Sequence, residues 1–152
     1  MAYEVKTEQR HEQPAAVVRG RVATDGIAEF IGGAFGEVMA AITAQHLAVM
    51  GPPFGRYHVL ETGFEVEAGF PTSGPVEPVG RVTPGTLPGG EVATTMHVGS
   101  YDGVAEAYTA VEQWLAAHEL APTGDPWESY LDGPEVPQPR TVVSFPCTRH
   151  QP

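Results

Sequence analysis

The feature that most constrains the fold of this chain is an internal repeat. Three pairs of segments match in the same order, at offsets between 73 and 77 residues. They are residues 25–29 (DGIAE) and 102–106 (DGVAE), residues 53–57 (PFGRY) and 126–130 (PWESY), and residues 70–71 and 145–146 (both FP). A nearly constant offset indicates that one structural unit occurs twice. We expect repeat halves at about residues 13–71 and 91–146, within a single domain covering residues 1–152.

Each half carries one helical pattern and several strand patterns. Apolar residues recur every three or four positions over residues 27–42 and 104–118, which predicts two helices that each bury one face. Asp25 is the expected N-cap of the first helix. Period-two alternation over residues 64–70 is typical of a half-buried strand. The predicted strands are residues 3–10, 15–22, 54–60, 64–70, 92–98, 127–131 and 140–145, with a connector rich in Pro and Gly over residues 72–90.

These elements predict an α+β fold made of duplicated strand–helix–strand–strand modules. Two such modules side by side would form one antiparallel sheet with two helices on one face. A central cleft would then lie at the pseudo-twofold axis between them. Gly32, Gly33 and Gly36 fall inside the first predicted helix, and we interpret them as marking close packing of that helix on the sheet.

Charge and composition exclude several classes of protein. The chain of 152 residues has 8 basic and 19 acidic side chains, a net charge of −11, which argues against direct binding of nucleic acid or an anionic membrane. No apolar run approaches the roughly 20 residues that span a bilayer, and the polar N-terminus does not resemble a signal peptide. We therefore expect a cytoplasmic protein. Cys147 is the only cysteine, and the histidine spacing predicts no metal site and no cofactor.

The segment 125–131 (DPWESYL) is the best candidate for a binding site. Strand alternation places Glu128 and Tyr130 on one face, with Trp127 on the other. The repeat puts Gly55 and Tyr57 in the equivalent places of the first half. A carboxylate among aromatic rings loses hydration and must be protonated or find a cation. The alternative is that Glu128 points to solvent while the aromatic residues belong to the core.

Five short motifs, in order, resemble a known family, the GyrI-like small-molecule-binding domain, also called the bacterial transcription activator effector-binding domain. The resemblance covers residues 3–145 and carries no DNA-binding helix-turn-helix. It therefore implies a standalone binding domain. The motifs are residues 51–57 (GPPFGRY), 67–71 (EAGFP), 87–90 (LPGG), 97–101 (HVGSY) and 127–131 (WESYL).

The resemblance also implies ligands and site residues. Family members bind bulky, hydrophobic and often cationic aromatic compounds, and the glutamate of the Trp-Glu-x-Tyr motif, here Glu128, lies in their pocket. The family's Gly-Pro-Tyr turn corresponds to Tyr101, although Ser100 stands where the family usually has proline. The expected ligand-binding residues are Glu128, Tyr130, Tyr57, Gly55, Tyr101, Met96, Trp127 and Phe145.

Three functions remain open at this point. The first, which we favour, is binding of lipophilic aromatic or cationic small molecules, with Glu128 ionised. The second is hydrolysis of cyclopropane-containing electrophiles in the same pocket, with Glu128 and Tyr57 as catalytic groups. The third is inhibition of gyrase through protein contact. Because the same residues serve the first two functions, the sequence does not separate binding from catalysis.

Overall fold

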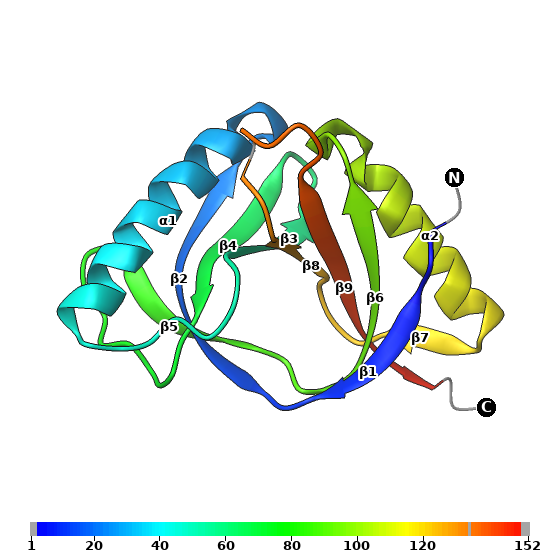
Figure 1. Ribbon diagram of the computed structural model, residues 1–152, viewed down its shortest axis with the longest axis horizontal. Coiled ribbons are helices and arrows are strands. Elements are labelled where there is room, and N and C mark those ends of the chain that lie inside the picture. Colours follow the sequence, from blue (N-terminus) through cyan, green and yellow to red (C-terminus); the bar gives the residue numbers. More distant parts are fainter. Residues whose placement is uncertain (1–2, 134, 150–152) are drawn as a thin grey trace. The chain divides into compact units, whose positions relative to one another are not determined.

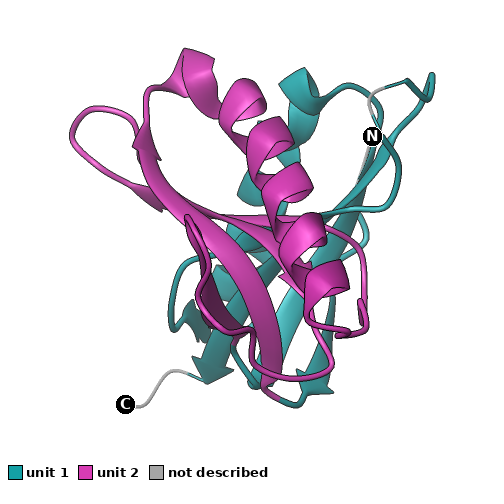
Figure 2. Ribbon diagram, turned by 90° about the vertical axis from the view of Figure 1, so that its left-hand side faces the viewer, with its two compact units in different colours: residues 1–11, 88–152 teal, residues 12–87 magenta. Residues whose placement is uncertain are grey.

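A computed structural model describes residues 3–133 and 135–149 of the chain. Contacts between residues divide the chain into two compact units, coloured separately in Figure 2. Unit 1 combines Met1–His11 with Pro88–Pro152, and unit 2 is Glu12–Leu87. Each unit is a small α+β assembly with antiparallel strands and one long helix.

Unit 2 contains a four-stranded antiparallel sheet in the order β3-β4-β2-β5. Its helix α1 packs on one face of this sheet (Figure 1), where Ala34, Val38 and Ile42 meet side chains of β2 and β4. The elements are β2 (Gln13–Val22), the 3₁₀ turn η1 (Thr24–Gly26), α1 (Ile27–Ala44), β3 (Phe54–Val59), β4 (Phe64–Pro71) and β5 (Val82–Leu87).

Unit 1 repeats this arrangement with the order β8-β9-β6-β1, and a short strand, β7, also pairs with β9. Helix α2 buries Ala107, Val111 and Leu115 against Val143 and Phe145 of β9. The elements are β1 (Lys6–Arg10), β6 (Gly90–Val98), η2 (Tyr101–Gly103), α2 (Val104–Ala117), β7 (Leu120–Pro122), β8 (Trp127–Tyr130) and β9 (Arg140–Arg149).

The duplication holds down to the register of individual residues. In unit 2, Val66 of β4 lies between Tyr57 of β3 and Gly20 of β2. In unit 1, the equivalent row places Thr141 between Tyr130 and His97. Even the ends of the helices agree, because His46 and Glu119, two residues past each helix, both have a positive φ, of 58° and 60°. The predicted repeat of strand, helix, strand and strand is therefore present.

The first strand of each repeat pairs with the other repeat. β1 leads directly into β2 of unit 2, yet it pairs with β6 of unit 1. Likewise, β5 leads into β6 of unit 1 but pairs with β2 of unit 2. The equivalent registers are Arg10 opposite Gly90 and Leu87 opposite Gln13. Each unit thus completes its sheet with a strand supplied by the repeat of the other unit.

Several local expectations need correction. The connector over residues 72–90 contains strand β5, and its Pro84 and Gly85 concealed the strand pattern. Strand β7, of three residues, was not predicted either. Asp25 lies inside η1 rather than at the N-cap of α1, which is Gly26. Ser100, in contrast, does cap η2, because its Oγ accepts a hydrogen bond from the Asp102 N–H at 3.2 Å.

Helix α1 differs from expectation in two respects. Gly32, Gly33 and Gly36 do not mark close packing, since a Cβ at any of them would meet nothing within 4 Å. The segment Thr24–Ala44 is also long and apolar enough to cross a membrane by length and composition alone, which corrects the expectation that no such run exists. Its buried side chains pack on the unit 2 sheet.

Gly69 of β4, in contrast, permits a close approach of two backbones. A Cβ at this position would lie 1.8 Å from the carbonyl oxygen of Ala16 on β2, so the paired strands would have to move apart. We expect Gly69→Ala to destabilise the protein by about 3 kcal/mol. The control, Gly36→Ala on the exposed side of α1, should stabilise it by up to about 1 kcal/mol. Thermal denaturation checks both, and equal melting temperatures for the two variants would contradict the argument.

Candidate functional site

The candidate site lies on the face of the unit 1 sheet that α2 covers. Glu128 of β8 is opposite Val143 of β9, which in turn is opposite Thr95 of β6. Val143 packs in the core beneath α2. Because side chains in one row of a sheet share a face, Glu128 points to the same side as α2. Its side chain is half-buried there, which rules out the alternative of a glutamate fully in solvent.

Two tyrosine hydroxyls hold the Glu128 carboxylate. Tyr108 of α2 donates to Oε2 at 2.5 Å, and Tyr130 of β8 donates to Oε1 at 3.0 Å. Among the residues that the structure describes, no Lys or Arg forms a salt bridge with Glu128. A carboxylate has about four lone-pair sites, so two of them stay available for a ligand or water.

The electrostatics of Glu128 follow from this setting. Loss of hydration raises the pKa of the Glu128 carboxyl above its ordinary value. The hydrogen bonds from Tyr108 and Tyr130 oppose this rise, and so does the interaction with His97, but burial prevails. The two tyrosine hydroxyls therefore orient the carboxylate without cancelling its charge.

Tyr101, in the η2 turn, joins this group as expected. Its ring lies edge-on to that of Tyr130, with centroids 5.9 Å apart, and its hydroxyl donates to the Asp132 carbonyl at 3.1 Å. Burial, followed by the charges of Glu135, Asp132 and Glu128, raises the pKa of Tyr101. Ser100 has a φ of −52°, close to the value that proline fixes, so its presence in place of the family's proline leaves the turn intact.

Phe145 also lies on this face and was among the expected residues. Its ring packs edge-on against Tyr108 with centroids 5.7 Å apart. The structure thus brings together Glu128, Tyr130, Tyr101 and Phe145 from the expected set. It adds Tyr108, which the sequence analysis assigned only to the apolar stripe of a helix.

Two expected residues lie on the opposite face of the unit 1 sheet. Trp127 pairs with Ser144 and is fully buried, with the Arg10 guanidinium 5.8 Å from its ring centroid. Met96 pairs with Val142, and its side chain is 43% exposed. Because alternation turns both side chains away from Glu128, neither belongs to the group that surrounds the carboxylate.

Gly55 and Tyr57 lie on β3 of unit 2, in the places that the repeat assigns to them. Gly55 pairs with Ala68 and Tyr57 with Val66, as Glu128 and Tyr130 pair with Val143 and Thr141 in unit 1. The Tyr57 ring is edge-on to Phe64, with centroids 6.2 Å apart. That these two residues line the same ligand site as Glu128 stays a prediction.

Unit 2 serves as an internal control for the polar residues of the site. At five positions it builds the same sheet and helix with apolar or small residues where unit 1 has polar ones. In the order Thr95, His97, Tyr108, Glu128 and Thr141, its equivalents are Val18, Gly20, Ile31, Gly55 and Val66. Burying polar groups is costly, and unit 2 forms its sheet and helix without them. The fold itself therefore does not require polar residues at these positions.

The same comparison shows how the additional site residues could have been found. Aligning the halves at an offset of 77 residues sets Tyr108 against Ile31 and His97 against Gly20. A polar residue in one half, aligned with an apolar residue or glycine in the other, marks a candidate site residue in the sequence alone. Thr141 gives a weaker signal, since its alignment with Val66 depends on the offset of 75 at the last strand.

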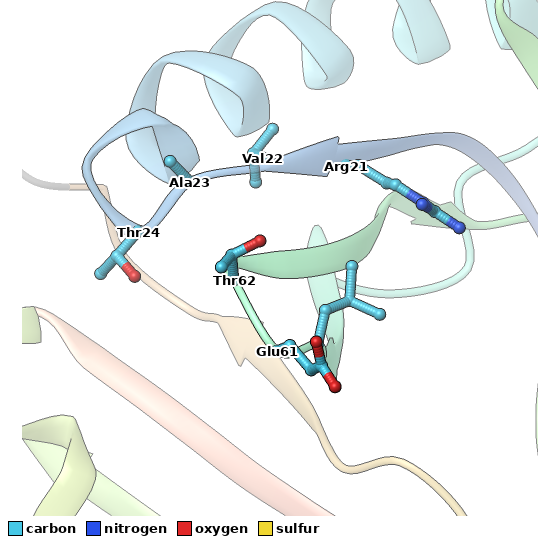
Figure 3. Close-up of a pocket in the computed structure, with 8 residues that line it drawn as sticks. Arg21, Val22, Ala23, Thr24, Glu61 and Thr62 are labelled. Atoms are coloured by element: carbon cyan, nitrogen blue, oxygen red, sulfur yellow. The ribbon is translucent and has the colours of Figure 1, made fainter.

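A hollow of about 640 Å³ in unit 2 is a different feature. It is open to solvent and lies between the end of β2 and the β3–β4 turn, as Figure 3 shows. The lining residues are Arg21, Val22, Ala23, Thr24, Leu60, Glu61, Thr62 and Gly63. None of the expected ligand-binding residues lines it, and we do not assign a function to it. Among the described residues, no cluster of His, Cys, Asp or Glu has the arrangement of a metal site.

Comparison with known proteins identifies the family. The sequence profile of the GyrI-like small molecule binding domain matches residues 1–144. The chain belongs to the GyrI-like family. The match confirms the resemblance inferred from the motifs, and with it the general function of small-molecule binding. No curated protein matches this GyrI-like chain by sequence.

Solved structures share the GyrI-like fold at low sequence identity. The EcmrR C-terminal domain is 22% identical, with a TM-score of 0.85, and the match covers 99% of this chain and 100% of that one. A hydrolase from Listeria innocua is 14% identical, with a TM-score of 0.69 and coverage of 97% and 93%. SAV2435 bound to tetraphenylphosphonium is 13% identical, with a TM-score of 0.63 and coverage of 97% and 94%. These likenesses confirm the α+β fold.

The raised pKa of Glu128 predicts how stability depends on pH. Folding favours the protonated carboxyl, so the contribution of Glu128 to stability is greatest below its ordinary pKa of about 4.5 and is lost as the pH rises through the raised pKa. Glu128→Gln removes this titration. We expect the variant to melt at a higher temperature than the wild type at pH 7.5, and the difference to shrink toward pH 4.

Thermal denaturation across that pH range checks this prediction. Glu112→Gln, at an exposed position of α2, is the control and should show no such trend. A wild type that is more stable than Glu128→Gln at pH 7.5 would show that the site stabilises the ionised carboxylate.

Proposed function

We propose that this GyrI-like domain binds bulky aromatic cations on the α2-covered face of unit 1, with Glu128 as the partner of the positive charge. The observation that supports this most is the setting of Glu128: a half-buried carboxylate with two neutral hydroxyl donors and no salt bridge to a described cationic side chain. Such a group gains more from a desolvated cation than from a neutral ligand.

The aromatic residues support the same proposal. Tyr108 and Tyr130 contact the carboxylate, and each of them packs edge-on against a further ring, Phe145 and Tyr101 respectively. A cation over an aromatic face gains about 0.5–2 kcal/mol, depending on its desolvation. The net charge of −11 raises the concentration of cations near the protein. A relative of the same fold, SAV2435, has been solved bound to tetraphenylphosphonium, a compound of this class.

Binding of a matched pair of ligands tests the proposal. Tetraphenylphosphonium carries a positive charge, and triphenylphosphine oxide is a neutral compound of similar bulk. We expect Glu128→Gln to weaken binding of the cation about tenfold or more, because a charge-assisted contact of about 1.5–3 kcal/mol is lost. Binding of the neutral compound should change little. Isothermal titration calorimetry measures both, with Glu112→Gln as the control. Equal losses for the two ligands would remove the charge-pairing argument.

Hydrolysis of a cyclopropane-containing electrophile is the second candidate. It is favoured by the contact between the Tyr108 hydroxyl and a carboxyl whose pKa is raised by burial, since burial favours the protonated form that a general acid needs. A relative of the same fold is described as a hydrolase from Listeria innocua.

Turnover of such a compound distinguishes the two candidates. If the domain is a hydrolase, we expect product to form faster than in buffer, and the rate to fall about 10²–10⁴-fold in Glu128→Gln, the typical range for acid–base catalysis. Chromatography of the reaction mixture gives the rate. A rate equal to that of buffer alone would reject hydrolysis and leave binding as the function.

A further inference from the structure

We infer that His97 is a positioning residue of the ligand site, which holds the η2 turn and through it sets the place of Tyr101. The inference rests on the proposed function, because it takes Tyr101 to contact the ligand. His97 itself lies on β6, is only 6% exposed, and does not hydrogen bond to Glu128. Its direct influence on Glu128 is electrostatic. Any effect of His97 on the geometry of the site therefore passes through other residues.

Both ring nitrogens of His97 are engaged. Nε2 lies 2.8 Å from the carbonyl oxygen of Ser100. Because a carbonyl only accepts hydrogen bonds, Nε2 must carry the hydrogen. Nδ1 lies 2.8 Å from the hydroxyl of Tyr3, which can donate to it or accept from it. These two bonds fix the orientation of the imidazole.

The bond to Ser100 acts directly on the turn that carries Tyr101. The same carbonyl accepts a hydrogen bond from the Gly103 N–H at 3.1 Å, which closes the turn. The absence of a side chain at Gly103 leaves room for the imidazole, since a Cβ there would lie 3.1 Å from Cε1 of His97. Tyr101 follows Ser100, and its ring contacts Tyr130, which donates to Glu128. An uninterrupted series of contacts thus joins His97 to the carboxylate.

Unit 2 shows that the turn itself does not need a histidine. There Gly26 donates to the Ala23 carbonyl at 2.9 Å, so the equivalent turn closes in the same way. The residue equivalent to His97 is Gly20, and the space above it is filled by Phe30, since a Cβ at Gly20 would lie 2.6 Å from Cε1 of that ring. The residue equivalent to Tyr101 is Thr24. The histidine therefore occurs in the half whose turn carries the site tyrosine.

Hydrogen exchange tests this inference without any ligand. In His97→Phe, which keeps an aromatic ring but loses both hydrogen bonds, we expect the Gly103 amide to exchange about fivefold faster than in the wild type, because a bond of about 1 kcal/mol no longer supports the turn. The Gly26 amide in unit 2 is the internal control and should not change. His97→Gln retains an N–H donor for Ser100 and should restore most of the protection. Unchanged exchange at Gly103 in His97→Phe would overturn the inference.

A double-mutant cycle with tetraphenylphosphonium tests the route through Tyr101. We expect His97→Phe and Tyr101→Ala each to weaken binding about five- to tenfold. Added to Tyr101→Ala, His97→Phe should have no further effect, because the residue it positions is already gone. Losses that multiply in the double variant would mean that His97 acts independently, which would overturn the inference. A wild type that does not bind this cation would contradict the proposed function, while the exchange measurement would still decide the role of His97.

Discussion

The site depends on one physical constraint, which is that a carboxylate deprived of water must be given other partners. Glu128 receives two, the hydroxyls of Tyr108 and Tyr130, and both are neutral. An arginine in their place would satisfy the charge and close the site to cations. Tyrosine hydroxyls orient the carboxylate while leaving its charge uncompensated, and their rings form the apolar surroundings that make the charge costly. Under the proposed function, the same side chains would favour a cation and form the surface that receives it.

The duplicated fold separates what structure needs from what function needs. Both units stack a helix on a sheet with identical register, yet the polar residues around Glu128 have apolar or small equivalents in unit 2. A single-copy protein would not reveal this difference without an alignment of relatives. Here the second copy provides the comparison, and it singles out Tyr108, His97 and Thr141 beside the glutamate that the family motif indicates.

The elements predicted from the sequence are confirmed where a periodic pattern or a repeated segment extends over enough residues. The sequence predicted the duplication, both helices and the common face of Glu128 and Tyr130, because period and offset depend only on the order of residues. It did not predict β5, where Pro84 and Gly85 occupy an edge strand, nor β7, which has three residues. It counted Trp127, next to Glu128 in the motif, and Met96, five residues before Tyr101, among the ligand-binding residues. Strand alternation turns both side chains away from the carboxylate. The helix pattern alone did not single out Tyr108, since an apolar stripe does not show which of its members meets a strand; only its alignment with Ile31 in the other half does so.

The exchange of first strands gives the chain an interlocked connectivity. Neither repeat completes its own sheet. β1 precedes the first repeat in sequence but pairs with β6 of the second, and β5 precedes the second repeat but pairs with β2 of the first. A lone repeat would have an unpaired sheet edge at β2 or β6, together with a first strand that has nowhere to pair. Such a module could pair all of its strands only in a dimer with a second copy of itself, in which each molecule gives its first strand to the sheet of the other. The present chain has the connectivity expected of that homodimer after its two subunits were fused into one polypeptide, in which the two halves can carry different residues at equivalent positions, such as Glu128 and Gly55.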